Sequence, residues 1–201
     1  MVTSKAGILI ALEGIDGSGK STQLALVGKK LRELGYSVYM TQEPSKAKIG
    51  KLLREYLMDK NSSPYIDALL FAADRFEHYL HEVQDKLEKG NIVITDRYVA
   101  SSIVYQGAHG ADADWIKMIN SKVVKPDLSI YLDVDLDVSL SRIDKSSRID
   151  IEKFENIQFL TKAVELYKNM LSDDFILIPA NDDAETVSGR IIKAIVNRFY
   201  S

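Results

Sequence analysis

Short apolar segments alternate along the chain with longer amphipathic ones. Within each short segment the apolar residues are nearly continuous, which is typical of parallel strands buried on both faces of a sheet. These segments cover residues 7–12, 36–41, 91–95, 128–134 and 175–180. The amphipathic segments indicate helices near residues 20–34, 64–89, 113–123, 136–142, 153–171 and 184–199. The alternation predicts an α/β fold, a doubly wound, five-stranded parallel sheet flanked by helices.

The pattern contains no linker, internal repeat or low-complexity segment, so we expect one domain over residues 1–201. Of the residues, 46% are hydrophobic and 27% charged, as in a globular core rather than a disordered chain. The net charge of −3 gives no general reason to expect a nucleic-acid partner. There is no cysteine for thiolate chemistry, and no apolar run nears the ~18 residues that cross a bilayer. We therefore expect a cytoplasmic protein without a membrane partner.

Residues 14–21, GIDGSGKS, match the pattern G-x-x-x-x-G-K-[ST] in full, between an apolar segment and a helical one. In such a loop, backbone N–H groups converge on the β-phosphate of a nucleoside triphosphate at a helix N-terminus. Lys20 would reach the β- and γ-oxygens, and Ser21 would offer its hydroxyl to Mg²⁺. A plain glycine-rich turn is the alternative, which the context disfavours. The residues expected to bind ATP are Gly14, Ile15, Asp16, Gly17, Ser18, Gly19, Lys20, Ser21 and Thr22.

The remaining motifs narrow the class of nucleotide-binding protein. The string N-K-x-D, with which a GTPase binds guanine, is absent, and the single D-x-x-G lies inside the phosphate loop. A kinase, an ATPase and a nucleotide-sensing module remain. Only a kinase needs a second site for an acceptor, so candidate acceptor residues distinguish these classes.

A first candidate acceptor site follows the third apolar segment, in TDRYVASSIVYQG at residues 95–107. Parallel strands present ligands at their carboxyl ends, so Asp96 and Arg97 are expected beside the phosphate loop. Arg97 offers a planar fork to a phosphate, and Asp96 could hold a Mg²⁺-bound water. An ion pair at the end of the strand is the alternative interpretation.

Two further segments carry candidates. Phe71 and Arg75 are four residues apart in a predicted helix, where a ring and a guanidinium could bind a flat base. A core phenylalanine and a solvated arginine would have the same spacing.

Residues 141–150, SRIDKSSRID, combine Arg142, Lys145 and Arg148 with a serine-rich turn. They are either a charged surface turn or a lid, about residues 142–152, that brings cations to a transferring phosphoryl group.

With these pieces in order, the chain resembles the thymidylate kinases nearly end to end. The matching segments are EGIDGSGKST, TQEP, LLFAADRFE, DRYVASSIVYQG and KPDLSIYLDVD, followed by the basic lid. Many ATP-using enzymes share the phosphate loop. The motif DRY…S…YQG within residues 96–107, in combination with FAADR, is much more specific to this family. The resemblance implies an ATP:thymidylate phosphotransferase of the mononucleotide-kinase type, with Mg²⁺, thymidine 5′-monophosphate (dTMP) as acceptor and usually a homodimer.

The resemblance also implies roles for single residues. Asp16 matches the loop acid that reads the 3′-hydroxyl of the acceptor, and Arg97 matches the arginine that holds its phosphate. Tyr105 matches the aromatic side chain that crowds the 2′ position of the sugar. The residues matched to the thymine base are Phe71, which stacks on it, Arg75, which donates to O4, and Ser101 and Ser102, at the pyrimidine edge.

Two departures from the family pattern concern charge. Gln42 stands where many bacterial members have an arginine that helps to hold the acceptor phosphate, and Lys46 or Lys48 are candidates to replace it. Gly17 stands where some members place a catalytic arginine. Here the lid is basic instead, so the chain resembles the lid-arginine subgroup, which implies catalysis by Arg148 and packing of Arg142 on adenine. The expected catalytic residues are Lys20, Arg97, Arg148 and Asp16.

Two alternative functions remain at this stage. One is a related kinase for uridylate, cytidylate or a deoxynucleoside; a nucleoside kinase would need a carboxylate base and would have less use for Arg97. The other is a regulatory module that binds nucleotides without transfer, which would need neither an acceptor pocket nor a basic lid.

The lid arginine generates a first prediction. A guanidinium that meets charge in the transition state is worth roughly 10³–10⁵ in kcat in related systems. Arg148→Ala should therefore lower kcat at least ~10²-fold, with Lys145 substituting in part, and change KM for either substrate little. Lys145→Ala should do less. Steady-state kinetics test this prediction. If kcat of the Arg148 variant stays within a few-fold of the parent's, the catalytic charge would be assigned to Arg142 instead.

Overall fold

A parallel sheet forms the centre of the protein. The computed structural model describes residues 7–58, 62–143 and 157–200. All strand pairs in the sheet are parallel, and the strand order is β2-β3-β1-β4-β5. The strands are β1 (Ile8–Glu13), β2 (Val38–Gln42), β3 (Ile92–Asp96), β4 (Leu128–Asp133) and β5 (Phe175–Pro179). Each predicted apolar segment supplies one strand, so the predicted fold class is confirmed.

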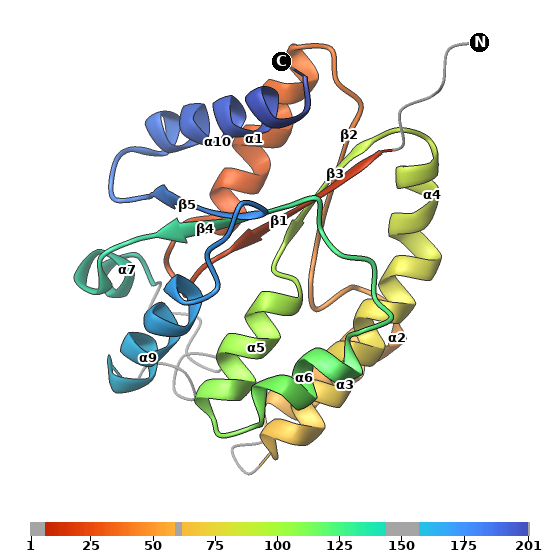
Figure 1. Ribbon diagram of the computed structural model, residues 1–201, viewed down its shortest axis with the longest axis vertical. Coiled ribbons are helices and arrows are strands. Elements are labelled where there is room, and N and C mark those ends of the chain that lie inside the picture. Colours follow the sequence, from red (N-terminus) through yellow and green to blue (C-terminus); the bar gives the residue numbers. More distant parts are fainter. Residues whose placement is uncertain (1–6, 59–61, 144–156, 201) are drawn as a thin grey trace.

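Helices cover both faces of this sheet. Figure 1 shows α1 and α10 on one face and α3, α5 and α9 on the other. The helices are α1 (Lys20–Glu33), α2 (Lys48–Leu57), α3 (Pro64–His78), the π-helical turn η1 (Tyr79–Val83), α4 (Gln84–Glu88), α5 (Val99–Ala108), α6 (Ala113–Ile119), α7 (Leu136–Arg142), α9 (Ile157–Lys168) and α10 (Ala184–Phe199). The helix predicted near 64–89 is α3, η1 and α4 in succession, and α9 is the described part of the helix predicted over 153–171.

Side-chain caps fix the start of several helices. Ser63 accepts a hydrogen bond from the backbone N–H of Tyr65 at the start of α3, where Pro64 suits the first helical position. Asp183 caps α10 by accepting from the backbone N–H groups of Glu185 and Thr186. These bonds satisfy backbone donors that a helix leaves without partners in its first turn.

Two helices, α2 and α5, were not predicted. α5 has the sequence VASSIVYQGA, whose β-branched and serine residues obscure a helical pattern. Seven of its ten residues are buried, so it has little of the polar face that marks an amphipathic helix. α2 is only ten residues long and contains Gly50, which packs closely against the backbone of Ser45. We infer that tertiary packing, rather than a local sequence pattern, makes these two segments helical.

The order of the strands determines where the site lies. β1 and β3 are neighbours in register, with Leu12 opposite Asp96, and Gln42 of β2 is opposite Asp96 on the other side. The loops that follow β1, β2 and β3 consequently meet at one edge of the sheet.

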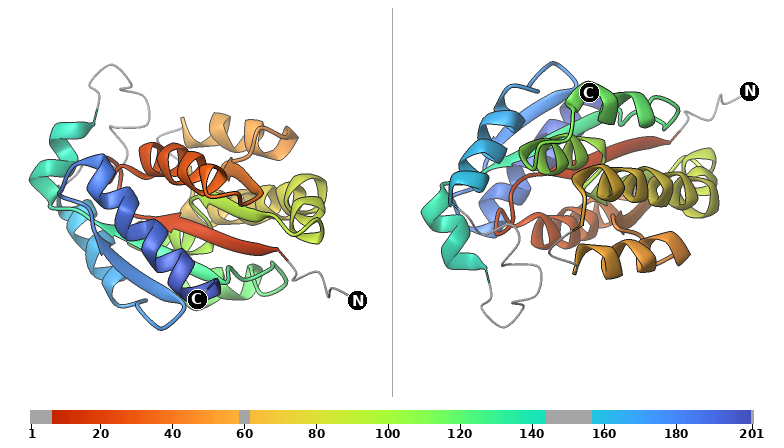
Figure 2. Two further views of the ribbon diagram at one scale, coloured as in Figure 1. Left: turned by 90° about the horizontal axis from the view of Figure 1, so that it is seen from above. Right: turned by 90° about the horizontal axis from the view of Figure 1, so that it is seen from below.

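In Figure 2, α7 lies beside α9 at the side of the molecule remote from α4.

The core accounts for the nearly continuous apolar pattern of the strands. All residues of β1 and β3 are buried, as expected for strands covered on both faces. The charged residues of these two strands, Glu13 and Asp96, lie at their carboxyl ends. Within the part of the chain that the structure describes, no helix is both long and apolar enough to cross a membrane.

Candidate active site

The phosphate loop lies between β1 and the N-terminus of α1. Gly19 stands immediately before α1 with φ 93°, a left-handed conformation that glycine adopts without strain. The first turn of α1 has no acidic residue, so its N–H groups and helix dipole remain favourable for an anion. Lys20 is buried, and its Nζ donates to the carbonyl oxygens of Gly14 (3.0 Å) and Ile15 (2.8 Å). The loop thus brings the N-terminus of α1 and a buried ammonium group together, an arrangement that could hold an anion.

A cavity of about 250 Å³ opens at this loop. It is lined by Asp16, Gly17, Gly19, Lys20, Ser21, Thr22, Asp96 and Arg97. The Ser21 hydroxyl donates to Oδ2 of Asp96 over 2.7 Å, which brings two oxygen ligands together. Mg²⁺ prefers oxygen ligands and keeps several waters, so this pair fits a Mg²⁺ ion shared with nucleotide phosphates. In the described residues there is no cluster of three or more His, Cys, Asp or Glu side chains suited to a metal.

Arg97 is held in an unusual backbone conformation directly after β3. Its φ is 72°, in the left-handed region that non-glycine residues adopt at a cost of roughly 1–3 kcal/mol. Its backbone N–H donates to the carbonyl of Leu12 (2.9 Å), and its carbonyl accepts from the hydroxyl of Thr95 (3.0 Å). These contacts fix the conformation, which aims the side chain across the loop that follows β1.

The Arg97 guanidinium contacts three side chains of the site. Its Nη2 forms an ion pair with the carboxylate of Asp16 and donates to the Tyr105 hydroxyl over 3.3 Å. Its Nη1 donates to Ser101 Oγ over 3.1 Å. The guanidinium also lies over the Tyr105 ring, 4.7 Å from the centroid. The structure therefore brings Asp16, Arg97, Ser101 and Tyr105 together.

The charge of Asp16 follows from these neighbours. Burial acts to raise its pKa, but the positive charges of Arg97 and Lys20 outweigh burial and hold the pKa of Asp16 below its usual value. Asp16 is therefore ionised at neutral pH. Its side chain lines both the cavity at the phosphate loop and a larger one next to it.

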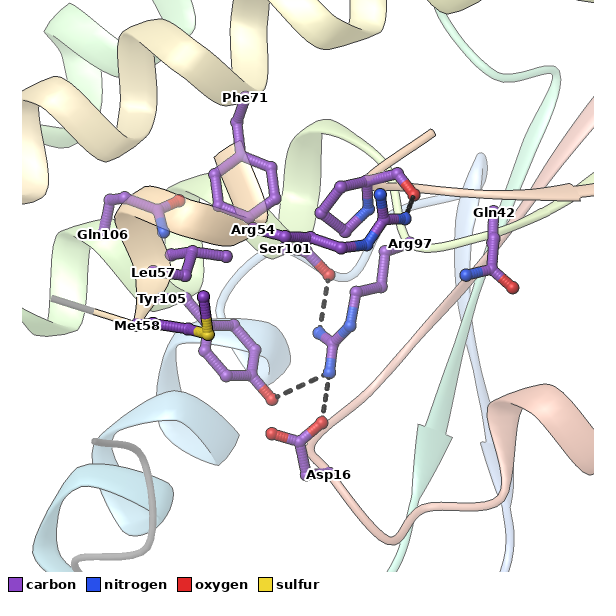
Figure 3. A pocket seen from close by; sticks show the side chains of 11 residues that line it. Asp16, Gln42, Arg54, Leu57, Met58, Phe71, Arg97, Ser101, Tyr105 and Gln106 are labelled. Carbon is purple, nitrogen blue, oxygen red and sulfur yellow. Dashed lines mark hydrogen bonds and ion pairs between the residues drawn. The ribbon is translucent and has the colours of Figure 1, made fainter. Parts of the chain in front are cut away.

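This larger cavity, about 480 Å³, lies between α2, α3 and α5 (Figure 3). It is lined by Asp16, Gln42, Pro44, Arg54, Leu57, Met58, Phe71, Arg97, Ser101, Tyr105 and Gln106. The two cavities share Asp16 and Arg97, so ligands in each would meet at this ion pair. Lys46 lines a separate cavity with Tyr39 and Glu82, and Lys48 is exposed at the start of α2. Arg54 is a cation of the larger cavity that the sequence did not indicate.

Phe71 and Arg75 share a helix but differ in position. Phe71 lines the large cavity, whereas Arg75 is buried and is not among the residues that line it. The Arg75 guanidinium donates to Glu43 Oε2 (2.8 Å), Asn120 Oδ1 (2.6 Å) and Ser102 Oγ (3.2 Å). Within the described residues, these contacts account for three of its five N–H donors. Sequence reasoning assigned no role to Glu43, although it lies in the TQEP segment, or to Asn120, because their common partner Arg75 is 32 and 45 residues away in the chain.

Glu13 is a second buried acid that sequence reasoning missed. Its Oε1 accepts from the backbone N–H of Tyr98 (3.0 Å), and its Oε2 accepts from the hydroxyls of Ser101 (2.6 Å) and Tyr167 (3.3 Å). Burial raises the pKa of Glu13, against the hydrogen bond from Ser101 and the charge of Arg97. The signal in the sequence that could have identified Glu13 was its position, an acidic residue directly after an apolar segment. Through Ser101, Glu13 supports the position of Arg97.

A third cavity, about 260 Å³, lies on the other side of the phosphate loop. It is lined by Ser18, Gly19, Thr22, Gln23, Arg142, Ala180, Asp182, Asp183, Ala184 and Val187. Nη1 of Arg142, at the end of α7, donates to the carbonyl oxygen of Ala180 over 3.2 Å. Arg142 therefore lines a cavity beside the phosphate loop, one that could hold the base of a nucleotide bound in the loop. Arg148 and Lys145 fall outside the residues that the structure describes.

Gly17 packs directly against α7. A Cβ built at Gly17 would lie 2.3 Å from the carbonyl oxygen of Ser139, and its φ is +74°. The Ser139 hydroxyl donates to the carbonyl of Asp16 in the same loop (2.5 Å). A side chain at position 17 would thus displace the loop or α7, so an arginine there is incompatible with this packing of α7.

The five-stranded parallel sheet and the phosphate loop define a P-loop protein with a second cavity beside the loop. A family model described as "Thymidylate kinase" matches residues 12–191. The chain is 45% identical over 188 residues to a "Probable thymidylate kinase" of Pyrobaculum aerophilum, covering 92% of this chain and 95% of that protein. It is also similar to proteins of the same description from Pyrobaculum calidifontis, 46% identical over 193 residues (95% and 96% covered), and Thermococcus kodakarensis, 38% over 199 (94% and 97%). The chain belongs to the thymidylate kinase family and is a phosphotransferase.

The contact between Gly17 and α7 predicts the effect of one added methyl group. Gly17→Ala should lower the free energy of unfolding by roughly 1–3 kcal/mol and weaken ATP binding, because the loop must move away from Ser139. Gly189→Ala in α10 is the matched control, since its Cβ would meet nothing within 4 Å. Denaturant unfolding and ATP titrations measure both effects. If Gly17→Ala binds ATP as tightly as the parent does, α7 can move away from the added methyl group without a cost to nucleotide binding.

Lys20 predicts a pH dependence of nucleotide binding. Burial and the charge of Arg97 lower its pKa to about 8, against the carboxylates of Asp96 and Asp16. The amine is charged below this pKa and loses its proton above it, whereas a bound phosphate favours the charged form. Binding of a non-hydrolysable ATP analogue should therefore take up close to one proton at about pH 9 and almost none at about pH 7. Calorimetry in buffers of different ionisation enthalpy measures the uptake, and none at the higher pH would contradict the lowered pKa.

Proposed function

We propose that the protein transfers the γ-phosphoryl group of ATP to the phosphate of dTMP, giving ADP and thymidine diphosphate. The observation that carries this proposal is the Asp16–Arg97 ion pair shared by the two cavities. A triphosphate in the loop would end at this pair, and a monophosphate in the large cavity would begin there. The family relationship supports the choice of ATP and dTMP.

In the proposed reaction an oxygen of the acceptor phosphate attacks the γ-phosphorus in line, and ADP leaves with the electrons of the broken bond. The acceptor oxygen is already an anion, so no general base is needed. Lys20 and the N–H groups of the loop hold the donor phosphates, and Arg97 holds the acceptor phosphate. Mg²⁺, bound by Ser21 and through water by Asp96, would neutralise charge on the transferring group.

Residues around the large cavity are proposed to select thymidine. Phe71 stacks on the base, and Asp16 accepts a hydrogen bond from the 3′-hydroxyl. Tyr105 limits space at the 2′ position, which favours deoxyribose. Ser101, bonded to both Arg97 and Glu13, lies at the pyrimidine edge together with Ser102.

Arg75 is proposed to read position 4 of the base from behind Ser102, to which it donates. A guanidinium offers only donors, so it favours the carbonyl of thymine or uracil over the amino group of cytosine. Discrimination between thymine and uracil would then rest on the space for one methyl group, worth about 1–3 kcal/mol. Arg148 remains the proposed catalytic cation, and Arg142 the proposed contact to adenine.

We also propose a homodimer that forms through α3. Three large apolar side chains, Ile66, Leu69 and Leu80, are 44%, 50% and 62% exposed along the continuous helical segment of α3 and η1. Their spacing places them on one stripe, as at a helix–helix contact. Sedimentation equilibrium tests the dimer, and a monomer at micromolar concentration would refute it.

The proposed donor, ATP, fits the cytoplasmic location that the sequence predicts.

The activity is tested with MgATP and a panel of acceptors. ADP release is expected to be fastest with dTMP, slower with dUMP, and much slower with dCMP, with thymidine and with ribonucleotides. Fastest turnover with cytidylate or a nucleoside would establish a related kinase instead. ATP binding without turnover of any acceptor would establish a regulatory module.

Asp16 offers a sharper test within the same assay. Asp16→Asn should lower kcat/KM for dTMP by roughly 10- to 100-fold, the worth of a hydrogen bond to a charged group, and leave ATP affinity nearly unchanged. The 3′-deoxy analogue of dTMP should lose much less in the variant, because it lacks the hydroxyl. Equal losses for both acceptors would mean that Asp16 acts only through Arg97.

A further inference from the structure

His78 is a buried residue at the end of α3 to which the proposed function assigns no role. It follows Arg75 by one helical turn, and its ring lies between two acids, Glu43 and Glu82. Nδ1 is 3.5 Å from Glu43 Oε1, and Nε2 is 3.8 Å from Glu82 Oε2. Nε2 is also 2.7 Å from the hydroxyl oxygen of Thr41. The two ring nitrogens therefore have different neighbours: Nδ1 faces a buried acid, whereas Nε2 faces a hydroxyl group and a half-buried acid.

The buried carboxylate of Glu43 has a donor on one oxygen only. Its Oε2 accepts from Nε of Arg75 over 2.8 Å. Its Oε1 is buried and has no hydrogen-bond partner among the residues that the structure describes. An unpaired acceptor in the interior is costly, and the ring nitrogen that faces Oε1 is Nδ1 of His78. A small rotation of the ring or of the carboxylate would bring these two atoms to hydrogen-bond distance.

The neighbours of the His78 ring determine which nitrogen holds the proton. A lone pair on Nδ1 would face the negative charge of Glu43, so a proton on Nδ1 is favoured. In the neutral ring, Nε2 then accepts from the hydroxyl of Thr41. In the cation, Nε2 donates to that hydroxyl, and Thr41 can donate to Glu82 Oε1, 3.5 Å away. Nδ1–H is directed at Glu43 in both states.

We propose that His78 is a positioning residue for recognition of the base: its Nδ1–H fixes the carboxylate of Glu43, and Glu43 fixes Arg75. A carboxylate held at one oxygen can still rotate, whereas a donor at each oxygen locks its plane. The orientation of Arg75 matters because a hydrogen bond to position 4 of the base weakens steeply when it is misaligned. This inference rests on the proposed function, since it assumes that Arg75 contacts that position.

Two substitutions of His78 separate the roles of its two nitrogens. The amide nitrogen of asparagine can reach the place of Nδ1, and that of glutamine the place of Nε2. His78→Gln, which loses the donor to Glu43, should raise KM for dTMP about tenfold with kcat nearly unchanged, the effect of one lost hydrogen bond in binding. His78→Asn, which keeps this donor, should stay within about threefold of the parent in both constants. His81→Gln is the matched control, because it removes an exposed imidazole from the adjoining helical turn η1 and should change neither constant.

A second acceptor distinguishes the positioning of Arg75 from a general loss of packing. The 4-deoxy analogue of dTMP has a hydrogen atom in place of O4 and offers Arg75 no acceptor there. Its KM should change less than about threefold in His78→Gln, whereas a loss of packing would raise KM for both acceptors alike. Proton–nitrogen NMR correlation spectra of the parent protein add a measurement that needs no variant, and they should show a proton on Nδ1 of His78.

Four results would overturn the role of His78. They are equal changes in KM for the two acceptors in His78→Gln, a KM for dTMP that this variant leaves within about threefold of the parent's, a loss in His78→Asn as large as in His78→Gln, and a proton on Nε2 alone. The parent protein tests the proposed function separately. Equal KM values of the parent for dTMP and its 4-deoxy analogue would contradict the proposed contact of Arg75 with the base, and the inference would fall with it.

Discussion

The ion pair between Asp16 and Arg97 is the contact on which the candidate site depends. It joins the loop after β1 to the loop after β3, and it exists because these strands are neighbours in register. Arg97 reaches Asp16 from a left-handed backbone conformation, which its bonds to Leu12 and Thr95 hold in place. The pair lines both the cavity at the phosphate loop and the larger cavity beside it, so in the proposed reaction one contact would set the distance between the two substrates.

Two sets of buried polar groups lie next to this pair: one set contains Ser101, a partner of Arg97, and the other contains Arg75. Glu13 holds Ser101 and the backbone of Tyr98, while Glu43 and Asn120 hold Arg75. Removing one member of such a buried set leaves the other member desolvated and unpaired, which costs more than the intact contact is worth. We infer that these acids serve geometry: they give the arginines of the site one orientation, and the sheet gives the acids rigid positions.

The two sides of the site are built differently. On the donor side, most ligands come from one stretch of backbone, and α7 closes on it through Gly17 and Ser139. On the acceptor side, the lining residues come from α2, α3, α5, the end of β2 and four loops. In the proposed function, the donor site would therefore bind what many nucleotides share, their phosphates, whereas the residues of the acceptor site would be specific to one substrate.

The sequence by itself determined the features whose cause is local. Apolar continuity identified all five strands, because burial on both faces leaves that mark on each strand separately. The phosphate loop and Ser21 could be predicted because a single turn between strand and helix contains them. Asp96 and Arg97 could be placed because a parallel sheet presents its carboxyl ends at one edge. Only the tertiary structure decided the helices α2 and α5, the burial of Arg75 behind Ser102, and the contacts of Glu13, Glu43, Asn120 and Arg54. Their partners are distant in the chain or belong to elements without a periodic pattern, so their function exists only once packing has brought them together.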